Sequence, residues 1–270
     1  MNSKYIFGAL ITIPLLPIMY FQGKRIRASV PSLPEAKGTE GTVTSFPSPK
    51  ALKIITLGES TIAGVGVTTH EEGFTGTFAK HLANKLNTNI SWKVYAKSGY
   101  TAKQVTVKLI PRIKETEADL FVIGLGANDS FTFNSPKQWG KDIDALIIAL
   151  REKFGNTPIL FTSMPPIKLF PAFTSLIKFS MGNLVEILGE TLEQTITKHD
   201  NVFYDAQKIS FENWIDKIDP STNSSDFFSD GVHPSKLTYQ IWARETANYV
   251  VQNSLVNNFF INLESTKHKH

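Results

Sequence analysis

The chain has 270 residues, of which 41% are hydrophobic and 19% are charged, and it contains no cysteine. This length suits one domain with a large core and is too short for two ordinary domains with a linker. The lack of cysteine excludes disulfides, a thiol nucleophile and zinc–thiolate sites. The net charge of +4 is mild and the sequence has no dense Lys/Arg stripe with interleaved aromatic residues, so we expect no nucleic-acid binding.

An apolar segment lies close to the N-terminus. Residues 5–21 are seventeen uncharged, mostly apolar residues, and three basic residues follow within the next six positions. Seventeen residues is the lower limit of length for a membrane-spanning helix. The run passes directly into basic residues, without the small residues of a signal-peptide cleavage site. Residues 1–27 therefore predict a single N-terminal anchor in the cell membrane. A cleaved signal peptide and a helix packed on the domain are the alternatives. The membrane face stays open, although the charge rule favours the cytoplasmic side.

The rest of the chain divides into three parts by composition. Residues 28–49 are rich in Pro, Gly, Ser and Thr without apolar periodicity, which is typical of a linker. Residues 50–254 carry the apolar patterns of a folded domain, and residues 255–270 form a polar C-terminal tail.

Within the domain, apolar runs typical of buried strands alternate with segments whose apolar residues recur at helical spacing. The predicted strands are Lys53–Leu57, Ile90–Tyr95, Asp119–Leu125, Thr157–Thr162 and Asn201–Tyr204. The predicted helices are His70–Leu86, Thr101–Lys114, Pro136–Phe154, Leu176–Lys198 and Ser235–Val251. This alternation predicts an α/β fold with a five-stranded parallel sheet and helices on both faces. In such a sheet a ligand site lies beyond the carboxyl ends of the strands.

A candidate nucleophile, Ser60, follows the first predicted strand by three residues. A turn at this place would present the serine hydroxyl at the sheet edge, where a base can take its proton as it attacks. An ordinary turn serine or an N-cap serine would give the same pattern, so Ser60 alone is a weak indication.

A candidate base with its orienting acid lies in a late loop. Asp230 and His233 are three residues apart, just before Pro234. This spacing lets the carboxylate bind one ring nitrogen while the other faces Ser60, as in a Ser-His-Asp triad. A loop histidine that caps the last helix is the structural alternative.

Acyl transfer also needs hydrogen-bond donors for the negative charge that develops on the carbonyl oxygen. The backbone amides of Ser60 and Gly99 and the side-chain amide of Asn128 are the candidates, because each follows a predicted strand. A simple turn after a strand would explain Asn128 and Asp129 without any function.

Four segments together resemble the SGNH hydrolases, also called GDSL-type esterases. They are Gly58-Glu59-Ser60, Ser98-Gly99, Gly126-Ala127-Asn128-Asp129 and Asp230-Gly231-Val232-His233. The resemblance extends from about Lys53 to Val250 and implies a flavodoxin-like three-layer α/β/α sandwich. It also implies that Ser60 is the nucleophile, that Ser60, Gly99 and Asn128 form the oxyanion hole, and that His233 is the base with Asp230 behind it. Where the family usually has Gly-Asp-Ser-Leu this chain has Gly-Glu-Ser-Thr, a change that we expect to alter turn packing more than mechanism.

The sequence therefore predicts a membrane-anchored serine ester hydrolase of the esterase or lipase type that needs no cofactor and no metal. Its substrate could be a small-molecule, lipid or glycan ester. An O-acyltransferase acting on a glycan with the same triad, or a non-catalytic membrane-tethered binding protein, is the alternative. The apolar loop Met164–Phe173 either lines an acyl pocket, touches the membrane or packs over the core.

Overall fold

A six-stranded sheet forms the centre of the computed structural model, which describes residues 3–47, 51–218, 222–253 and 255. The strand order is β1-β3-β2-β4-β5-β6, and all neighbouring pairs are parallel except β1 with β3. The strands are β1 (Glu40–Val43), β2 (Ala51–Gly58), β3 (Asn89–Ala96), β4 (Leu120–Gly124), β5 (Ile159–Phe161) and β6 (Val202–Tyr204). The predicted α/β fold is confirmed, with one strand more than the five that were predicted.

The additional strand, β1, lies in residues 28–49, which the sequence predicts as a linker. It pairs antiparallel with β3, so that Glu40 faces Lys93 and Val43 faces Ile90. Its four residues alternate between exposed and half-buried positions at the edge of the sheet. A short edge strand with a polar face lacks the continuous apolar run of a central strand, and for this reason the sequence pattern missed it.

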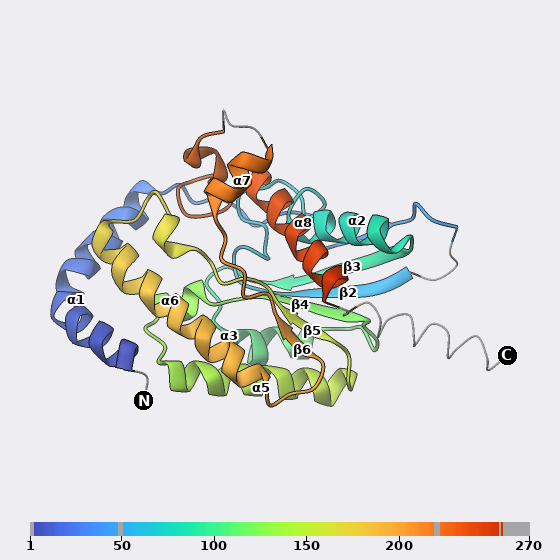
Figure 1. The fold of residues 1–270 in the computed structure, drawn as a ribbon, viewed down its shortest axis with the longest axis horizontal. Coiled ribbons are helices and arrows are strands. Elements are labelled where there is room, and N and C mark those ends of the chain that lie inside the picture. Colours follow the sequence, from blue (N-terminus) through green and yellow to red (C-terminus); the bar gives the residue numbers. More distant parts are fainter. Residues whose placement is uncertain (1–2, 48–50, 219–221, 254, 256–270) are drawn as a thin grey trace.

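Helices cover both faces of the sheet, as Figure 1 shows. On one face, α2 (Phe74–Leu86) and α8 (Lys236–Gln252) pack over the side chains of Ile54 and Val122. On the other face, α5 (Pro136–Phe154) and α6 (Ser175–Ile196) pack over Ile55 and its neighbours. Consecutive strand residues point to opposite faces, and β4 is buried throughout because both faces are covered.

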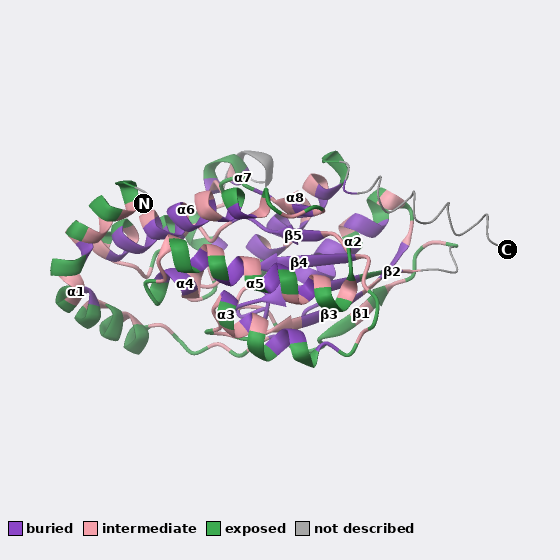
Figure 2. Cartoon of the chain, turned by 90° about the horizontal axis from the view of Figure 1, so that it is seen from below, coloured by how far each residue is buried: buried purple, intermediate pink, exposed green. Residues whose placement is uncertain are grey.

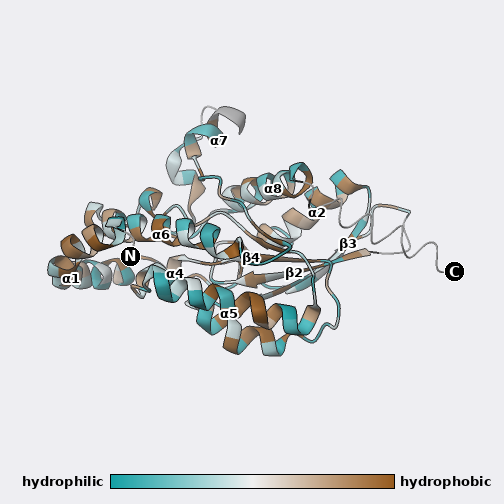
Figure 3. Cartoon of the chain, turned by 60° about the horizontal axis from the view of Figure 1, so that its bottom comes forward, coloured by the Kyte–Doolittle hydropathy of each residue, from teal (hydrophilic) through white to brown (hydrophobic). Residues whose placement is uncertain are grey.

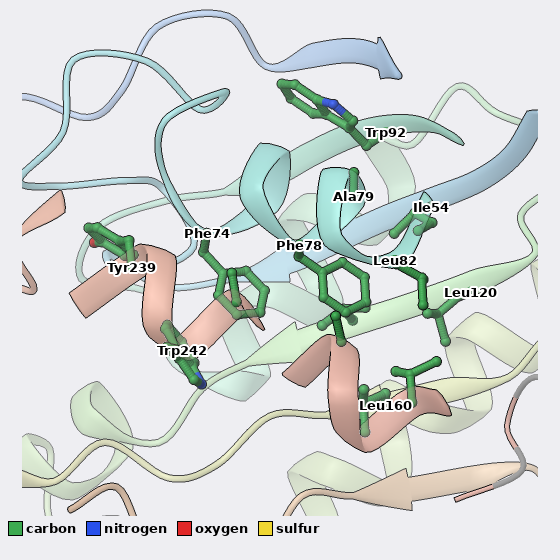
Figure 4. Packing of buried hydrophobic residues seen from close by; sticks show 14 of the residues in the cluster. Ile54, Phe74, Phe78, Ala79, Leu82, Trp92, Leu120, Leu160, Tyr239 and Trp242 are labelled. Carbon is green, nitrogen blue, oxygen red and sulfur yellow. The ribbon is translucent and has the colours of Figure 1, made fainter. Parts of the chain in front are cut away.

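Aromatic side chains join α2 and α8 above the sheet (Figure 4). The ring centroids of Phe74 and Trp242 are 4.3 Å apart, and Phe78 stacks on Phe74 at 5.9 Å. Phe78 and Tyr239 are fully buried in the same cluster. This packing fixes the helix that follows the late loop, and with it the position of that loop.

The remaining helical elements depart from the predicted ranges in detail. The predicted helix 101–114 is a short α3 (Ala102–Gln104), a π-helical turn η1 (Val105–Leu109) and a 3₁₀ turn η2 (Ile110–Arg112). The predicted helix 70–86 begins at Phe74, because His70 lies in the preceding turn, where it is buried. Four further short elements are α4 (Ala127–Phe131), η3 (Ile167–Leu169), α7 (Phe211–Ile218) and η4 (Ser224–Phe227).

The N-terminal apolar segment forms a long helix, α1 (Ser3–Ser29), which lies alongside α6 (Figure 1). By length and composition it is apolar enough to cross a membrane. Thr12 and Met19 are buried, whereas most of the helix is exposed or half-buried (Figure 2). The predicted polar tail, residues 255–270, lies outside the described residues except for Leu255, which is buried.

Candidate active site

Three strands end in one row at the edge of the sheet that carries the candidate site. Gly58 at the end of β2 pairs with Ala96 of β3 on one side and with Gly124 of β4 on the other. Ser60, Gly99 and Asn128 follow these residues by two, three and four positions. The chain runs from β2 outward to β3 and then to β4 on the other side, so this edge is the topological switch point, where α/β sheets bind ligands.

Ser60 stands in the turn that leaves β2. The turn is held by hydrogen bonds from the Ala63 amide to the Glu59 carbonyl (2.8 Å) and from the Val65 amide to the Ser60 carbonyl (3.1 Å). A side chain at Gly58 would collide with the carbonyl of Gly124, so glycine lets β2 and β4 approach closely here. The Ser60 side chain is half-buried at the edge of the sheet.

Glu59 is buried directly behind Ser60 and binds the start of α4. Its two carboxylate oxygens accept hydrogen bonds from the backbone amides of Ala127 and Asn128, both at 2.9 Å. Burial raises the pKa of Glu59 to about 7, although the two amide hydrogen bonds act to lower it. The Glu59 side chain therefore links the turn of Ser60 to the segment of Asn128. The sequence predicts an effect of Glu59 on turn packing, and this contact adds a direct link between two segments of the candidate site.

The loop of Gly99 is held from two sides. The Lys97 amide donates to the Gly58 carbonyl (3.1 Å), and the Ser98 amide donates to Glu35 Oε1 (2.8 Å). Burial acts to raise the pKa of Glu35, but the Ser98 amide and Lys97 lower it below its usual value. Gly99 has a φ of 82°, in the left-handed region that glycine adopts without steric cost.

Asn128 lies in the first turn of α4 and faces the Gly99 loop. Its Nδ2 atom donates to the Tyr100 carbonyl at 3.2 Å. The next residue, Asp129, is fully buried and accepts a hydrogen bond from the Ala102 amide (2.9 Å). Burial raises the pKa of Asp129 to about 6. These contacts fix the three segments of Ser60, Gly99 and Asn128 relative to one another.

Asp230 and His233 form a hydrogen-bonded pair. His233 Nδ1 lies 2.7 Å from Asp230 Oδ2, while the amides of Val232 and His233 donate to Asp230 Oδ1 at 2.9 and 2.7 Å. Burial acts to raise the pKa of Asp230, but these hydrogen bonds lower it below its usual value. The carboxylate therefore stays ionised and orients the imidazole ring.

The loop of His233 lies beside the turn of Ser60. The Tyr239 hydroxyl on α8 donates to the Val65 carbonyl at 2.7 Å. A side chain at Gly66 would collide with the Pro234 carbonyl, so the two backbones touch. The Ser60 hydroxyl and His233 Nε2 have no hydrogen-bond partner among the described residues. The structure therefore shows no hydrogen bond between the Ser60 hydroxyl and His233.

The apolar loop after β5 packs over the core beside the site. Ile167 and Phe170 are buried in a cluster that includes Met19 of α1, whereas Leu169 is 40% exposed. A small cavity of about 40 Å³, lined by Thr61, Phe170 and Pro234 among others, lies beneath the site. In the part of the chain that the structure describes, no group of three His, Asp or Glu side chains could hold a metal ion.

Two residues at the site have a structural role that the sequence patterns did not indicate. Glu59 and Glu35 act through backbone amides that are 68 and 63 residues away in sequence, and no spacing rule reports such contacts. The position of Glu59 next to the candidate nucleophile could have indicated a role at the site. Glu35 lies in the predicted linker, where the sequence gives no such indication.

The chain matches the sequence model of the GDSL-like lipase/acylhydrolase family over residues 56–241, which is more than half of its length. The match begins in β2 and ends in α8, so it contains all four segments described above. The chain therefore belongs to the GDSL-like lipase/acylhydrolase family, and it is a hydrolase. No curated protein sequence matches it significantly.

Solved structures agree with this fold. The lipase Lip_vut3 from a goat rumen metagenome is 19% identical, with a TM-score of 0.54, over 74% of this chain and 98% of the lipase. The psychrotrophic esterase EstA from Pseudoalteromonas sp. is 19% identical, with a TM-score of 0.51, over 76% and 98% of the two chains. A G-D-S-L lipolytic protein from Veillonella parvula is 15% identical, with a TM-score of 0.53, over 74% and 98%. At these identities the likeness shows the fold alone.

Proposed function

We propose that this hydrolase cleaves carboxylic esters through an acyl-enzyme formed on Ser60. The observation that carries the proposal is the 2.7 Å hydrogen bond between His233 Nδ1 and Asp230 Oδ2. An aspartate on one ring nitrogen leaves the other to take the proton of a serine, the division of work in a Ser-His-Asp triad. The position of Ser60 on the turn beside the His233 loop supports this assignment.

In the proposed reaction, Ser60 Oγ attacks the ester carbonyl carbon while His233 Nε2 takes the hydroxyl proton. His233 then gives this proton to the leaving alcohol as the bond between the acyl carbon and the alcohol oxygen breaks. A water molecule, activated by the same ring nitrogen, releases the acid and restores Ser60. Asp230 stays ionised and stabilises the imidazolium that forms in both steps, a role that its lowered pKa supports.

The negative charge of the tetrahedral intermediate needs donors aimed at the carbonyl oxygen. We propose that the backbone amides of Ser60 and Gly99 and the side chain of Asn128 supply them. Asn128 Nδ2 carries two hydrogens, and the bond to the Tyr100 carbonyl uses one of them, which leaves the second for the substrate. Glu59 and Glu35 are positioning residues, since they hold these donors without touching the substrate.

The test compares the full chain with Ser60→Ala, His233→Ala and Asp230→Ala. Ser60→Ala should abolish labelling by a fluorophosphonate and lower the hydrolysis of nitrophenyl acetate by up to about 10⁶-fold. Ser91→Ala is the matched control, because Ser91 lies on β3 at the opposite end of the sheet. Equal labelling of the wild type and Ser60→Ala would contradict the assignment.

The same experiment separates the alternatives. Labelling of Ser60 with little hydrolysis, but with acyl transfer to an added glycan, would identify an O-acyltransferase. A folded wild-type protein that is neither labelled nor active would be a binding protein.

We further propose that α1 is retained and holds the hydrolase at the cell membrane. Phe7, Leu10 and Phe21 on its outward side are 66%, 68% and 69% exposed, and large exposed apolar surfaces mark interaction sites. Because the other side of α1 packs on α6, we expect the helix to lie in the membrane interface with its C-terminal basic residues near anionic headgroups.

Membrane fractionation with mass determination tests this second proposal. The protein should remain in the membrane fraction after a high-salt wash and should have its intact mass of 30.1 kDa. A mass lower by about the first twenty to thirty residues, with the protein in the soluble fraction, would identify a cleaved signal sequence instead.

A further inference from the structure

A polar cavity of about 90 Å³ lies at the carboxyl ends of β5 and β6, where α7 stands beside α8 (Figure 3). Ser163, which follows β5 by two residues, and Asp205, which directly follows β6, line it together with Trp242 of α8. Most of the other lining residues are polar or charged as well. None of them belongs to the candidate active site.

Three buried polar groups in the wall of this cavity lack a partner. Trp242 Nε1 has no hydrogen-bond acceptor in the described part of the chain. The hydroxyl of Ser163 and Oδ2 of Asp205 also make no hydrogen bond to a described residue, although the two residues are only 7% and 4% exposed. The other oxygen of Asp205, Oδ1, accepts a hydrogen bond from the Gln207 amide at 3.2 Å. Buried polar groups are almost always paired, so these three indicate an occupant.

The framework of the fold holds these groups in place. The Trp242 ring packs against Phe74 of α2, with the ring centroids 4.3 Å apart (Figure 4), and this contact fixes the indole. The Asp205 amide donates to the Phe161 carbonyl at 2.9 Å, which extends the pairing of β5 with β6 by one residue. Burial raises the pKa of Asp205 to about 6, against the lowering effect of a backbone hydrogen bond, and Glu245 adds to the rise. At neutral pH the carboxylate is therefore mostly ionised and serves as an acceptor.

The unpartnered groups select a ligand that both donates and accepts hydrogen bonds. An ammonium group has no lone pair for Trp242 Nε1, and an anion would be repelled by Asp205 and Glu245, which also lines the cavity. Lys208 is another lining residue, but its side chain is 83% exposed and pairs with Glu186. A hydroxyl group can donate to the carboxylate and accept from the indole. The wall therefore suits a neutral molecule with several hydroxyl groups.

The aromatic residues and the size of the cavity agree with such a ligand. Trp214 and Trp242 add apolar ring surface, which the C–H groups of a sugar can contact. An apolar cavity of about 150 Å³ takes up benzene, so one of 90 Å³ holds part of a ring. The rest of the ligand would lie outside the cavity.

The cavity is a neighbour of the candidate active site. Ser163, Ile209 and Trp242 line both this cavity and the smaller one beneath the turn of Ser60. The strand register places Asp205 level with Gly58, the last residue of β2. Since β6 is three strands from β2 and strands are about 4.8 Å apart, Asp205 lies about 14 Å from the end of β2.

We propose that this cavity binds neighbouring hydroxyl groups of a neutral polyol such as a sugar. One hydroxyl accepts a hydrogen bond from Trp242 Nε1, the next donates to Asp205 Oδ2, and Ser163 Oγ binds either of them. The site stands apart from the proposed esterase chemistry, because its groups neither attack the ester nor carry its protons. Its ligand is the alcohol part of a substrate ester or a separate polyol, and both have the same chemistry.

Binding to the full chain is measured with methyl glucoside, a neutral sugar that contains no ester. A ligand of this size should bind with a Kd of about 1 mM, which saturation-transfer NMR detects. Cyclohexanol has a similar ring with a single hydroxyl and should bind about tenfold more weakly, since it cannot pair Trp242 and Asp205 together. Equal binding of the two probes, or no saturable binding of the glucoside, would overturn the proposal, because the cavity would then hold water only.

Variants of the unpartnered groups assign the binding to this cavity. Trp242→Phe keeps an aromatic ring against Phe74 but removes the donor, and Ser163→Ala removes a single hydroxyl. Each should weaken binding of the glucoside about fivefold, and Asp205→Asn, which removes a charged acceptor, about tenfold. If Trp242→Phe fails to fold, the smaller change in Ser163→Ala still decides the result.

Two matched controls accompany these variants. Trp92→Phe changes a tryptophan on β3 that is 6% exposed, as Trp242 is, but does not line the cavity. Asp200→Asn changes an aspartate before β6, at the opposite end of that strand from Asp205. Both controls should bind the glucoside as the wild type does. Wild-type affinity in Ser163→Ala and Asp205→Asn as well would overturn the proposal.

Hydrolysis of a cellobiose monoacetate distinguishes the two sources of the polyol, since a disaccharide can extend from Ser60 toward Asp205. If the polyol is the alcohol part of the substrate, Asp205→Asn should lower kcat/KM for this ester about tenfold and leave nitrophenyl acetate unchanged. Unchanged hydrolysis of both esters with weakened glucoside binding would identify a separate polyol ligand. Glucoside binding without Ser60-dependent hydrolysis would reject the esterase and retain the site, and hydrolysis without glucoside binding would do the reverse.

Discussion

At the scale of single residues, Glu59 links the candidate nucleophile, Ser60, to the candidate oxyanion donor Asn128. Its buried carboxylate receives the amides of Ala127 and Asn128, so the position of Asn128 depends on a side chain that precedes Ser60. An acceptor with two oxygens satisfies both amides at once, which the amide group of glutamine cannot do. Replacing Glu59 should therefore affect catalysis even though its side chain does not touch the substrate.

We therefore predict that Glu59→Gln lowers kcat by about 10–100-fold, less than the 10²–10³-fold expected for the loss of a donor itself. KM for nitrophenyl acetate should change little. The unpaired amide should also destabilise the fold by about 1–3 kcal/mol. Glu117→Gln is the control, since Glu117 is largely exposed in an ion pair with Lys53. Unchanged kinetics in Glu59→Gln would rule out a positioning role.

Stability should also depend on pH through Glu59. Its pKa of about 7 in the folded protein lies above the ordinary value of 4.5, so folding favours the protonated form. This contribution to stability is complete below pH 4.5 and is lost as the pH rises through about 7. Asp129 acts in the same direction between 3.8 and about 6. The lowered pKa of Asp230 has its effect below 3.8, outside this window.

The wild-type Tm is accordingly expected to fall between pH 5 and pH 8, and the fall should be smaller in Glu59→Gln. Circular dichroism melting curves at several pH values would measure both slopes. Parallel curves for the two proteins would show that Glu59 does not titrate in this range.

The five candidate site residues could be proposed from the sequence, because each stands in a short segment of definite spacing. Asp230 and His233 are three residues apart, and their hydrogen bond is local. Glu35 could not be found, since its contact with Ser98 depends on the path of the chain between them. Local patterns predict local geometry, and the contacts that tie separate segments together come from the fold.

At the scale of elements, the segment before β2 is part of the framework of the candidate active site. Glu35 holds the loop after β3, Lys37 forms a bridge with Thr69, and β1 pairs with β3. The central strands were predicted well because two covered faces demand continuous apolar runs. The segment before them was predicted as a linker because its ordered contacts are made by polar groups and backbone.

Replacing Glu35 tests this role. Glu35→Ala leaves the Ser98 amide without its acceptor, and we expect kcat to fall about tenfold with little change in Tm, since one net hydrogen bond is worth about 1 kcal/mol. Glu35→Gln keeps a carbonyl acceptor and should recover most of the activity. Glu40→Ala, which removes an exposed partner of Lys93, should leave kcat unchanged. An inactive Glu35→Gln would point to the charge instead of the acceptor.

At the scale of the whole molecule, apolar and basic side chains lie together at the end formed by α1 and α6. Phe131, Phe133 and Phe179 are exposed, and Phe133 and Phe179 line a cavity between α1 and α6. The basic residues at the C-terminal end of α1 are exposed as well. This combination is typical of a helix that binds an anionic membrane surface.

Replacement of Lys24, Arg25 and Arg27 by glutamine should weaken binding to vesicles that contain phosphatidylglycerol. Each basic residue near such a surface is worth about 1 kcal/mol, so the expected loss is about 100-fold. Binding to neutral phosphatidylcholine vesicles, which depends on the apolar side chains, should stay the same. Co-sedimentation measures both, and equal binding of variant and wild type to the charged vesicles would contradict the interface proposal.

The hydrogen bond between Glu35 and the Ser98 amide also limits the distance between the end of α1 and the candidate site. Glu35 follows Ser29, the last residue of α1, by six positions, so Glu35 and the Ser98 amide that it binds at the candidate site lie within about 20 Å of that helix end however the helix is oriented. A longer connecting segment between α1 and Glu35 would let the domain move into the surrounding solution. With α1 in the membrane interface, as proposed above, this connection keeps the candidate site within about 20 Å of the bilayer surface, so the esters that it meets are mainly those that the membrane presents.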